Sequence, residues 1–232
     1  MYKLKIEPHD KLLIVAPHPD DETIGCGGLM LAYGGQTDVL LITDGRTAHS
    51  DDITDEQCAI IRQAEFNNAI TQAGINEGLY LKLPDGKAYR CGKALKTIDF
   101  TRYTKIFLPN RSEEHPDHRA SYEYIKRRLF RKSCKAEIYV YEIWSPLSFA
   151  THYLDIGSII HLKDQLIDCY ESQLRIRDYH AMVRGLNAYR GICCHTEYAE
   201  AYELLSFKNK MKRWYFKLPI GWQERIIRIT KR

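Results

Sequence analysis

The chain has 232 residues, of which 44% are hydrophobic and 28% charged, and its formal net charge at pH 7 is +4. This is ordinary globular composition, which excludes a disordered, collagenous or disulfide-scaffold protein. The length suits one sizeable α/β domain rather than two domains of average size, so we expect a single domain.

The positive charge is concentrated at the C-terminal end. Residues 206–232 contain nine Lys or Arg and one acidic residue, a net charge of +8, which leaves −4 for the rest of the chain. We therefore expect a domain over 1–207 and a basic, aromatic tail over 208–232. Such a tail is typical of segments that bind an anionic membrane surface, and a C-terminal helix packed on the domain explains it equally well. We expect no nucleic-acid partner, because no nucleic-acid-binding motif accompanies the tail.

The N-terminal end and the cysteines favour the cytoplasm. The first ten residues are polar and charged, and the apolar run that follows, 11–16, is too short for a signal peptide or a membrane span. The seven cysteines lack paired CxxC spacing, which indicates reduced thiols. The basic tail allows a peripheral position at the inner face of the membrane.

Short aliphatic runs alternate along the chain with longer helix-like stretches, which predicts a parallel sheet covered by helices on both faces. The expected strands are 12–16, 38–43, 79–83, 105–108 and 137–143. The expected helices are 23–33, 54–73, 92–100, 118–131, 159–173 and 174–188, and residues 198–207 complete the body. The series predicts a Rossmann-like, three-layer α/β sandwich with a mostly parallel sheet.

Polar residues follow four of these expected strands. The loops begin at Pro17, Asp44, Pro84 and Pro109, and each contains at least one Asp, His or Arg. In an open parallel sheet, ligands bind where the strands end at their carboxyl edge. The sequence therefore predicts a functional site at that edge.

Two of these loops contain a set of metal ligands. His18 and Asp21 stand three residues apart on the loop after the first strand, and His118 follows the fourth strand. Two histidines and one carboxylate leave open positions on a zinc ion for water and substrate, as a catalytic site requires. The same ligands suit ferrous iron, but we expect zinc.

The neighbouring residues suit hydrolysis. A bound metal lowers the pKa of its water from about 15.7 to about 7 and polarises a carbonyl. Asp20 is placed to accept the proton of that water, so we assign it as general base. His115 is the candidate for stabilising the oxyanion, with Asp117 hydrogen-bonding either this imidazole or that of His118. The proton donor to the leaving amine is Asp20 or His115.

These motifs resemble a known family. Ala16-Pro-His-Pro-Asp-Asp-Glu22, paired with His115-Pro-Asp-His118, is similar to the signature of the LmbE-like or PIG-L deacetylases. That family contains the N-acetylglucosaminyl-phosphatidylinositol deacetylases and the deacetylases of mycothiol and bacillithiol synthesis. The resemblance implies a zinc-dependent hydrolase that removes an N-acetyl group from an amino sugar or glycoconjugate, which releases acetate and a free amine.

The resemblance implies the same roles for individual residues. His18, Asp21 and His118 correspond to the zinc ligands and Asp20 to the base, while His115 stabilises the oxyanion with support from Asp117. The substrate would be a small amino-sugar molecule or a lipid-linked saccharide.

The likeness extends over roughly residues 10–205. Arg62-Gln-Ala-Glu65 and Asp85-Gly86 resemble an Arg-x-x-Glu helix and an Asp-Gly loop of the family, which implies substrate binding by Arg62 and Asp85. There are two departures. Tyr170 stands where many relatives have a histidine, and Glu113 lies in a region where some thiol-pathway relatives carry a tyrosine that assists the oxyanion.

Two other functions fit part of this pattern. The first is a metal-dependent phosphoester or ester hydrolase, but many such sites use two metals about 3.5–4 Å apart, and the sequence offers ligands for one. The second is a non-catalytic protein that keeps a metal site for binding. The presence of the ligands, the base and the oxyanion group together favours the enzyme.

Overall fold

The computed structural model describes residues 1–49, 52–131 and 134–206, together with 218 and 222. The predicted tail, 208–232, therefore lies outside the described residues except for Leu218 and Trp222. Within the described part of the chain, no helix is both long enough and apolar enough to span a membrane.

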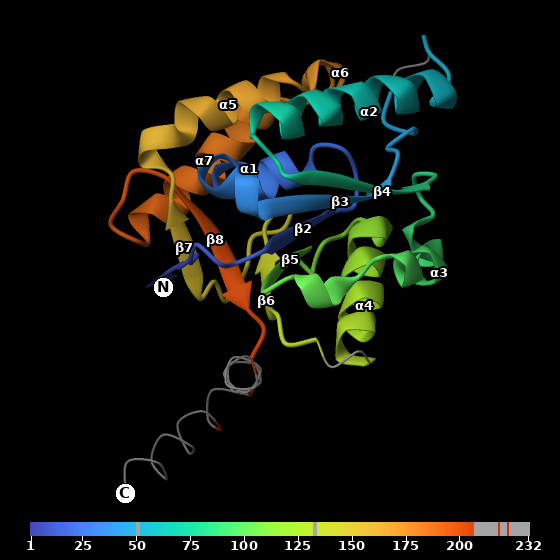
Figure 1. Ribbon diagram of the computed structural model, residues 1–232. Helices are drawn as coiled ribbons and strands as arrows, with labels where there is room; N and C mark the ends of the chain where they lie inside the picture. Colours follow the sequence, from blue (N-terminus) through green and yellow to red (C-terminus); the bar gives the residue numbers. More distant parts are fainter. Residues whose placement is uncertain (50–51, 132–133, 207–217, 219–221, 223–232) are drawn as a thin grey trace, which may run out of the picture.

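One eight-stranded sheet forms the middle layer, with the strand order β1-β7-β8-β6-β5-β2-β3-β4 (Figure 1). The strands are β1 (Tyr2–Lys3), β2 (Leu12–Ala16), β3 (Thr37–Thr43), β4 (Glu77–Leu83), β5 (Lys105–Pro109), β6 (Glu137–Tyr141), β7 (His152–Asp155) and β8 (Ala199–Leu204). Strand β8 runs antiparallel to both of its neighbours, and the other pairs are parallel. The prediction of a mostly parallel α/β fold is confirmed.

Helices cover both faces of this sheet (Figure 1). The α-helices are α1 (Asp21–Tyr33), α2 (Asp55–Gln72), α3 (Cys91–Ala94), α4 (Pro116–Arg131), α5 (Ile160–Asp168), α6 (Glu171–Leu174) and α7 (Tyr179–Ile192). The described residues also form short 3-10 helices: η1 (Gly34–Gln36), η2 (Ala88–Arg90), η3 (Leu95–Thr97), η4 (Phe100–Arg102) and η5 (Gly157–Ile159).

The two faces of β2 explain why its sequence is apolar throughout. Leu12 and Ile14 pack in the core under α1, α2, α5 and α7, whereas Leu13 and Val15 pack in a second core under η2, α3 and α4. Both sets are fully buried. Alternate side chains of a strand point to opposite faces, so a strand covered on both faces must be apolar at every position.

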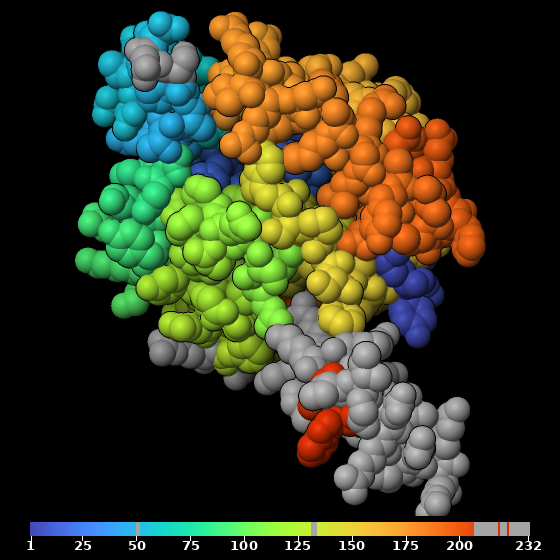
Figure 2. Space-filling model, turned by 180° about the vertical axis from the view of Figure 1, so that it is seen from behind, coloured from blue at the N-terminus to red at the C-terminus, as the bar shows by residue number. Residues whose placement is uncertain are grey.

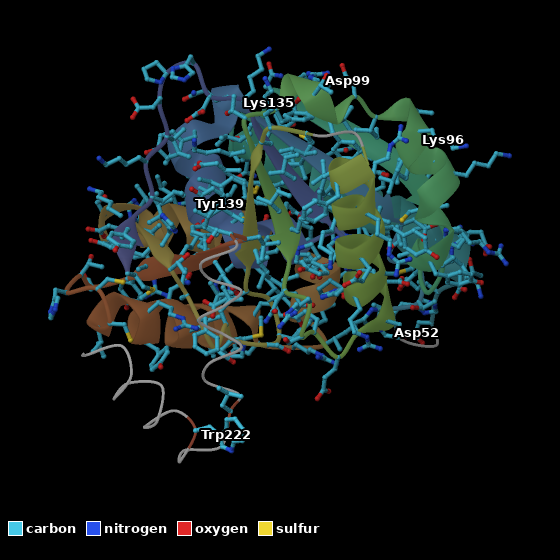
Figure 3. The ribbon with its side chains drawn as sticks, turned by 90° about the horizontal axis from the view of Figure 1, so that it is seen from below. Asp52, Lys96, Asp99, Lys135, Tyr139 and Trp222 are labelled. Atoms are coloured by element: carbon cyan, nitrogen blue, oxygen red, sulfur yellow. The ribbon has the colours of Figure 1, made fainter. Side chains whose placement is uncertain are left out.

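The strand order places a topological switch between β2 and β5. The chain runs outward from β2 through β3 to β4, and then returns to pair β5 with the other side of β2. Figure 3 shows Asp99 and Lys135, which precede β5 and β6, at one end of the molecule and Asp52, which follows β3, at the other. The loops after β2 and β5 therefore meet at the carboxyl edge, where ligands bind in such sheets.

Helix α1 is broken in its middle, where Cys26 has φ −136° and ψ 15°. A buried ion pair bridges the break: Lys163 Nζ donates to Ile24 O at 2.9 Å and to Glu200 Oε1 at 2.7 Å. Glu200 in turn accepts the freed amide hydrogens of Gly28 and Leu29, at 2.7 and 3.0 Å. The polar groups named here are thus paired inside the core, as buried polar groups require.

A glycine beside this break, Gly25, allows close packing. A Cβ on Gly25 would lie 2.2 Å from the ring of Tyr141, a separation that no side chain tolerates. Tyr141 itself donates a hydrogen bond to Val15 O at 2.6 Å. The glycine therefore brings α1 against the sheet, directly behind the loop that carries the predicted ligands.

Three expected helical regions differ in the structure. Residues 92–100 do not form one helix, because Asp99 caps a separate turn by accepting the amide hydrogen of Thr101 at 3.0 Å. Helix α7 begins at Tyr179 rather than at 174, since Asp178 accepts the amide hydrogen of Ala181 as its N-cap. Residues 159–173 are divided between η5, α5 and α6.

Candidate metal and active site

Three ligand atoms converge at the switch point. His18 Nδ1 lies 3.2 Å from Asp21 Oδ2 and 3.2 Å from His118 Nε2, and Asp21 Oδ2 lies 3.1 Å from His118 Nε2. Tetrahedral zinc with bonds of about 2.0–2.2 Å holds its ligand atoms roughly 3.3 Å apart. The spacing of this triangle of two imidazole nitrogens and one carboxylate oxygen is compatible with a zinc ion, and the structure brings the three residues that the sequence singled out to one place.

Backbone contacts fix the loop that carries two of these ligands. Thr43, at the end of β3, donates both its amide hydrogen and its hydroxyl to Pro17 O, at 3.0 and 2.8 Å. His18 N donates to Asp21 Oδ2 at 2.9 Å. The loop is thus tied to the neighbouring strand and to the first residue of α1.

Two further carboxylates surround His18. Its Nε2 lies 3.0 Å from Asp85 Oδ1 and 3.4 Å from Asp117 Oδ2. Burial lowers the pKa of His18, but the interactions with Asp117, Asp21 and Asp85 outweigh it and hold the pKa well above 6.5. With Nδ1 facing the triangle, a proton on Nε2 is shared with these carboxylates, an arrangement that orients metal-bound histidines.

Asp117 and Asp85 both approach His18, a contact that the sequence did not indicate. The sequence favours a bond from Asp117 to the imidazole of His115 or His118, yet its carboxylate faces His18 and accepts the amide hydrogens of Gly86 and Ala88, at 2.7 and 3.1 Å. Asp85, expected at the substrate, bonds His18 and accepts the hydroxyl of Thr47 at 2.6 Å.

His118 has a partner that sequence reasoning missed. Its Nδ1 lies 3.7 Å from Glu113 Oε2, and both atoms are buried without a hydrogen-bond partner among the described residues. The second oxygen of Glu113 accepts the amide hydrogen of Ser145 at 3.0 Å. Burial lowers the pKa of His118, whereas its interactions with Asp21 and Glu113 raise it to about 9. The only sequence signal is the acidic pair Glu113-Glu114, at a position where the chain departs from some relatives.

Asp20 lies beside the triangle in a strained backbone conformation, with φ 114°. Non-glycine residues avoid positive φ, and such strain is found at functional sites that the surrounding structure holds in place. The Asp20 carboxylate accepts from Arg62 Nη2 at 3.0 Å and from the Tyr179 hydroxyl at 3.1 Å. Burial raises the pKa of Asp20 to about 6, although the charge of Arg62 opposes the rise.

Arg62, expected at the substrate, donates hydrogen bonds to Asp20 and to the loops around it. The residue is only 3% exposed, and its acceptors in the loops are Pro19 O and Gly45 O. Gly45 has φ +65°, and a Cβ there would lie 2.4 Å from Arg62 Nη1. The guanidinium therefore binds the backbone of two loops as well as the Asp20 carboxylate.

Behind Asp20 lies a buried pair that the sequence did not reveal. The Tyr170 hydroxyl donates to Glu22 Oε1, and Glu22 Oε2 accepts the amide hydrogen of Asp20 at 3.3 Å. Burial raises the pKa of Glu22 to about 7, against the hydrogen bond from Tyr170. Tyr170, which replaces a histidine of many relatives, thus supports the strained loop from beneath.

His115 stands at the open side of the site. Its ring meets that of His18 edge-on, with centroids 4.6 Å apart, and its Nδ1 accepts the amide hydrogen of Asp117 at 3.3 Å. A neutral ring with Nδ1 as acceptor carries its proton on Nε2. Burial, together with the charges of His18 and His118, lowers the pKa of His115 below 6.5.

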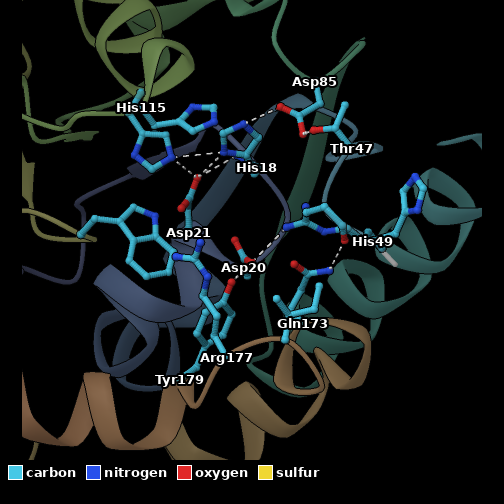
Figure 4. A pocket seen from close by; sticks show the side chains of 15 residues that line it. His18, Asp20, Asp21, Thr47, His49, Asp85, His115, Gln173, Arg177 and Tyr179 are labelled. Carbon is cyan, nitrogen blue, oxygen red and sulfur yellow. Dashed lines mark hydrogen bonds and ion pairs between the residues drawn. The ribbon is translucent and has the colours of Figure 1, made fainter. Parts of the chain in front are cut away.

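A cavity of about 310 Å³ opens over these groups (Figure 4). Figure 2 shows blue residues of the N-terminal part at the floor of a hollow between green and orange segments. The cavity contains Asp20, Asp21, His115 and other predicted site residues. Its remaining wall comes largely from late parts of the chain that the sequence motifs did not indicate, namely Trp144, Gln173, Ile176, Arg177 and Tyr179.

The fold and these side chains together define a Rossmann-like α/β protein with a His-His-Asp cluster at the carboxyl edge of its sheet. The model of the PIG-L family, described as GlcNAc-PI de-N-acetylase, matches residues 13–129, which is half of the chain. The chain belongs to the PIG-L family.

Solved structures share the fold. N,N'-diacetylchitobiose deacetylase from Pyrococcus horikoshii is 20% identical, with a TM-score of 0.74 over 84% of each chain. The conserved protein TT1542 from Thermus thermophilus is 23% identical, with a TM-score of 0.67 over 83% of this chain and 93% of that one. GalB, a 4-carboxy-2-hydroxymuconate hydratase from Pseudomonas putida, is 16% identical, with a TM-score of 0.69 over 84% of this chain and 96% of that one.

Proposed function

We propose that the protein is a zinc-dependent N-deacetylase that acts on an N-acetylated amino sugar or a glycoconjugate containing one. The observation that carries the proposal is the triangle of His18 Nδ1, Asp21 Oδ2 and His118 Nε2, with sides of 3.1–3.2 Å, beside a buried carboxylate. Membership of a family described by an N-deacetylase supports the reaction, and the diacetylchitobiose deacetylase of the same fold supports an amino-sugar substrate.

Zinc held by these three residues would polarise the amide carbonyl and lower the pKa of a coordinated water. Asp20 is the group that accepts the proton of the attacking water, since its carboxylate is held at the cavity by Arg62 and Tyr179. His115 faces the same cavity and offers the proton on Nε2 to the oxyanion or to the departing amine. Acetate and a free amine are the products.

The fold alone does not choose the reaction, because a hydratase shares it. Phosphoester hydrolysis by two metals gains no support from the described residues. Two groups of described residues could each offer three ligand atoms to a metal, His18 with His115 and His118, and His18 with Asp85 and Asp117, and both groups use the same histidine. The substrate is proposed as a soluble amino-sugar conjugate or a lipid-linked one. Residues 208–232, to which the membrane hypothesis belongs, lie mostly outside the described residues.

The test is acetate release from a panel of N-acetylhexosamine conjugates, soluble and lipid-linked, by the zinc-loaded protein. His18→Ala is the control, because it removes one ligand. Acetate release by the wild-type protein that is absent in His18→Ala supports the proposed reaction, and the conjugates that react define the substrate class. Well-folded, zinc-loaded protein that releases acetate from none of the conjugates would overturn the proposal.

A further inference from the structure

Arg177 is held at the wall of the active-site cavity. It lies between α6 and α7, where its amide hydrogen is donated to Gln173 O at 3.0 Å and its carbonyl accepts the amide hydrogen of Tyr179 at 3.0 Å. Its guanidinium stacks on Trp144, with the central carbon 4.9 Å from the ring centroid. Stacking on an aromatic ring restricts the side chain before any ligand arrives.

Further contacts link Trp144 to the proposed base, Asp20. The Trp144 ring meets that of Tyr179 at 63°, with centroids 5.8 Å apart, and the Tyr179 hydroxyl donates to Asp20. Figure 4 shows Arg177 and Tyr179 side by side, with both side chains extending toward Asp20 and Asp21. Arg177 is therefore fixed beside the position at which the acetamido group of a substrate would react.

The charges of the cavity leave Arg177 without a partner. Asp20 is paired with Arg62, Asp21 with the two ligand histidines, and Asp85 with His18. In the part of the chain that the structure describes, no carboxylate lies within ion-pairing distance of the Arg177 guanidinium. Arg62, the other arginine of the cavity, is already committed to Asp20 and two backbone carbonyls.

We propose that Arg177 binds an anionic group, a phosphate or a carboxylate, that the substrate carries next to its amino sugar. A guanidinium presents paired N–H donors that match both kinds of oxyanion, and stacking on Trp144 reduces the entropy lost on binding. This inference rests on the proposed deacetylase function and specifies its substrate class: an acidic glycoconjugate rather than a neutral one.

The test compares three ligands of the same sugar: methyl N-acetylglucosaminide, its carboxymethyl counterpart and N-acetylglucosamine 1-phosphate. Binding is measured by calorimetry in zinc-loaded Asp20→Asn protein, in which turnover does not disturb the titration. Arg177→Gln in this background should weaken binding of at least one anionic ligand about tenfold or more, while binding of the neutral glycoside stays within about twofold. The ligand that responds distinguishes phosphate from carboxylate.

Two further variants make the result specific. Arg177→Lys keeps the charge but not the paired donors, so it should recover part of the lost affinity. Arg175→Gln removes another exposed arginine two residues away and should change no affinity by more than about twofold. Equal loss for neutral and anionic ligands, no loss in Arg177→Gln, or a comparable loss in Arg175→Gln would each overturn the proposal.

The same three sugars distinguish a failure of this inference from a failure of the proposed deacetylase function on which it rests. If the wild-type protein hydrolyses all three with similar KM values and Arg177→Gln alters none of them, the anion site is wrong while the deacetylase stands. If the wild-type protein hydrolyses none but binds an anionic ligand through Arg177, the site stands and the proposed reaction fails.

Discussion

Glu113 Oε2 and His118 Nδ1 face each other at 3.7 Å inside the protein, and neither atom has a hydrogen-bond partner in the part of the chain that the structure describes. Because His118 directs Nε2 to the ligand triangle, its ring proton belongs on Nδ1, where it points to the Glu113 carboxylate. The pair therefore sets which nitrogen of His118 is available to a metal.

Replacing this carboxylate should weaken zinc binding. We expect Glu113→Gln to lower zinc affinity about tenfold, as the loss of a charged partner of a ligand histidine does elsewhere. Competition with a chelator measures it without reference to turnover. Glu114→Gln is the matched control, because Glu114 is exposed and its neighbour is buried. Equal affinities of the two variants would remove Glu113 from this role.

Replacing the proposed base should separate catalysis from metal binding. Asp20→Asn should keep zinc, since the three ligands are untouched, and should lose about two to four orders of magnitude in kcat. Metal content and kcat are measured on the same preparation. Wild-type turnover in this variant would exclude Asp20 as the base.

The pH dependence follows from the buried position of Asp20. Burial raises its pKa to about 6, and the ionised form is the base, so kcat/KM should fall about tenfold per unit as the pH drops below about 6. The Tyr179 hydrogen bond lowers this pKa, so Tyr179→Phe should move the acid limb to higher pH. An acid limb that stays in place would assign it to another group, and metal content at each pH excludes loss of zinc as its cause.

Arg62 offers a test between two roles. If it supports Asp20, then Arg62→Gln raises the Asp20 pKa, moves the acid limb upward and lowers kcat, while Arg62→Lys keeps much of the charge effect. If it contacts the sugar, as the resemblance implied, KM rises and the acid limb stays in place. Breaking a buried ion pair is destabilising, so both variants are compared by thermal unfolding before their rates are measured.

The apolar runs of the sequence predicted β2 to β6. The signal is strongest for β2 and β3, which are buried at every position because helices cover both faces of the sheet there. Strands β1, β7 and β8 were not predicted, and the first two of these are short and mostly not buried. Strand β8 contains Glu200 and Glu203, which are buried, and Glu200 is compatible with a core only because Lys163 and two backbone amides pair with it. Such long-range pairing leaves no periodic signal in the sequence.

The site, too, was predicted only in part. The proposed metal ligands lie in two short motifs, so their spacing in the sequence indicated the chemistry. The residues that contact the ligands and Asp20 are distant in sequence: Tyr179 is 159 positions from Asp20, and Asp85 is 67 positions from His18. The resemblance implied substrate contacts for Arg62 and Asp85, and both line the cavity. Their contacts with Asp20 and His18 could not be read from the sequence, because these residues become neighbours only when the sheet forms.

The buried ion pair across the break in α1 depends on residues that are synthesised long after the helix itself. Ile24 is joined to a lysine 139 positions later, and Gly28 to a glutamate 172 positions later. A nascent chain that has reached residue 129 already contains every proposed zinc ligand. Neither Lys163 nor Glu200, which bridge the break in α1, has been synthesised at that stage. Contacts so distant in sequence form late in folding. A truncated product that ends before β8 would thus carry the complete motif of the family but would lack Glu200, the partner of Lys163 and of the amides of Gly28 and Leu29.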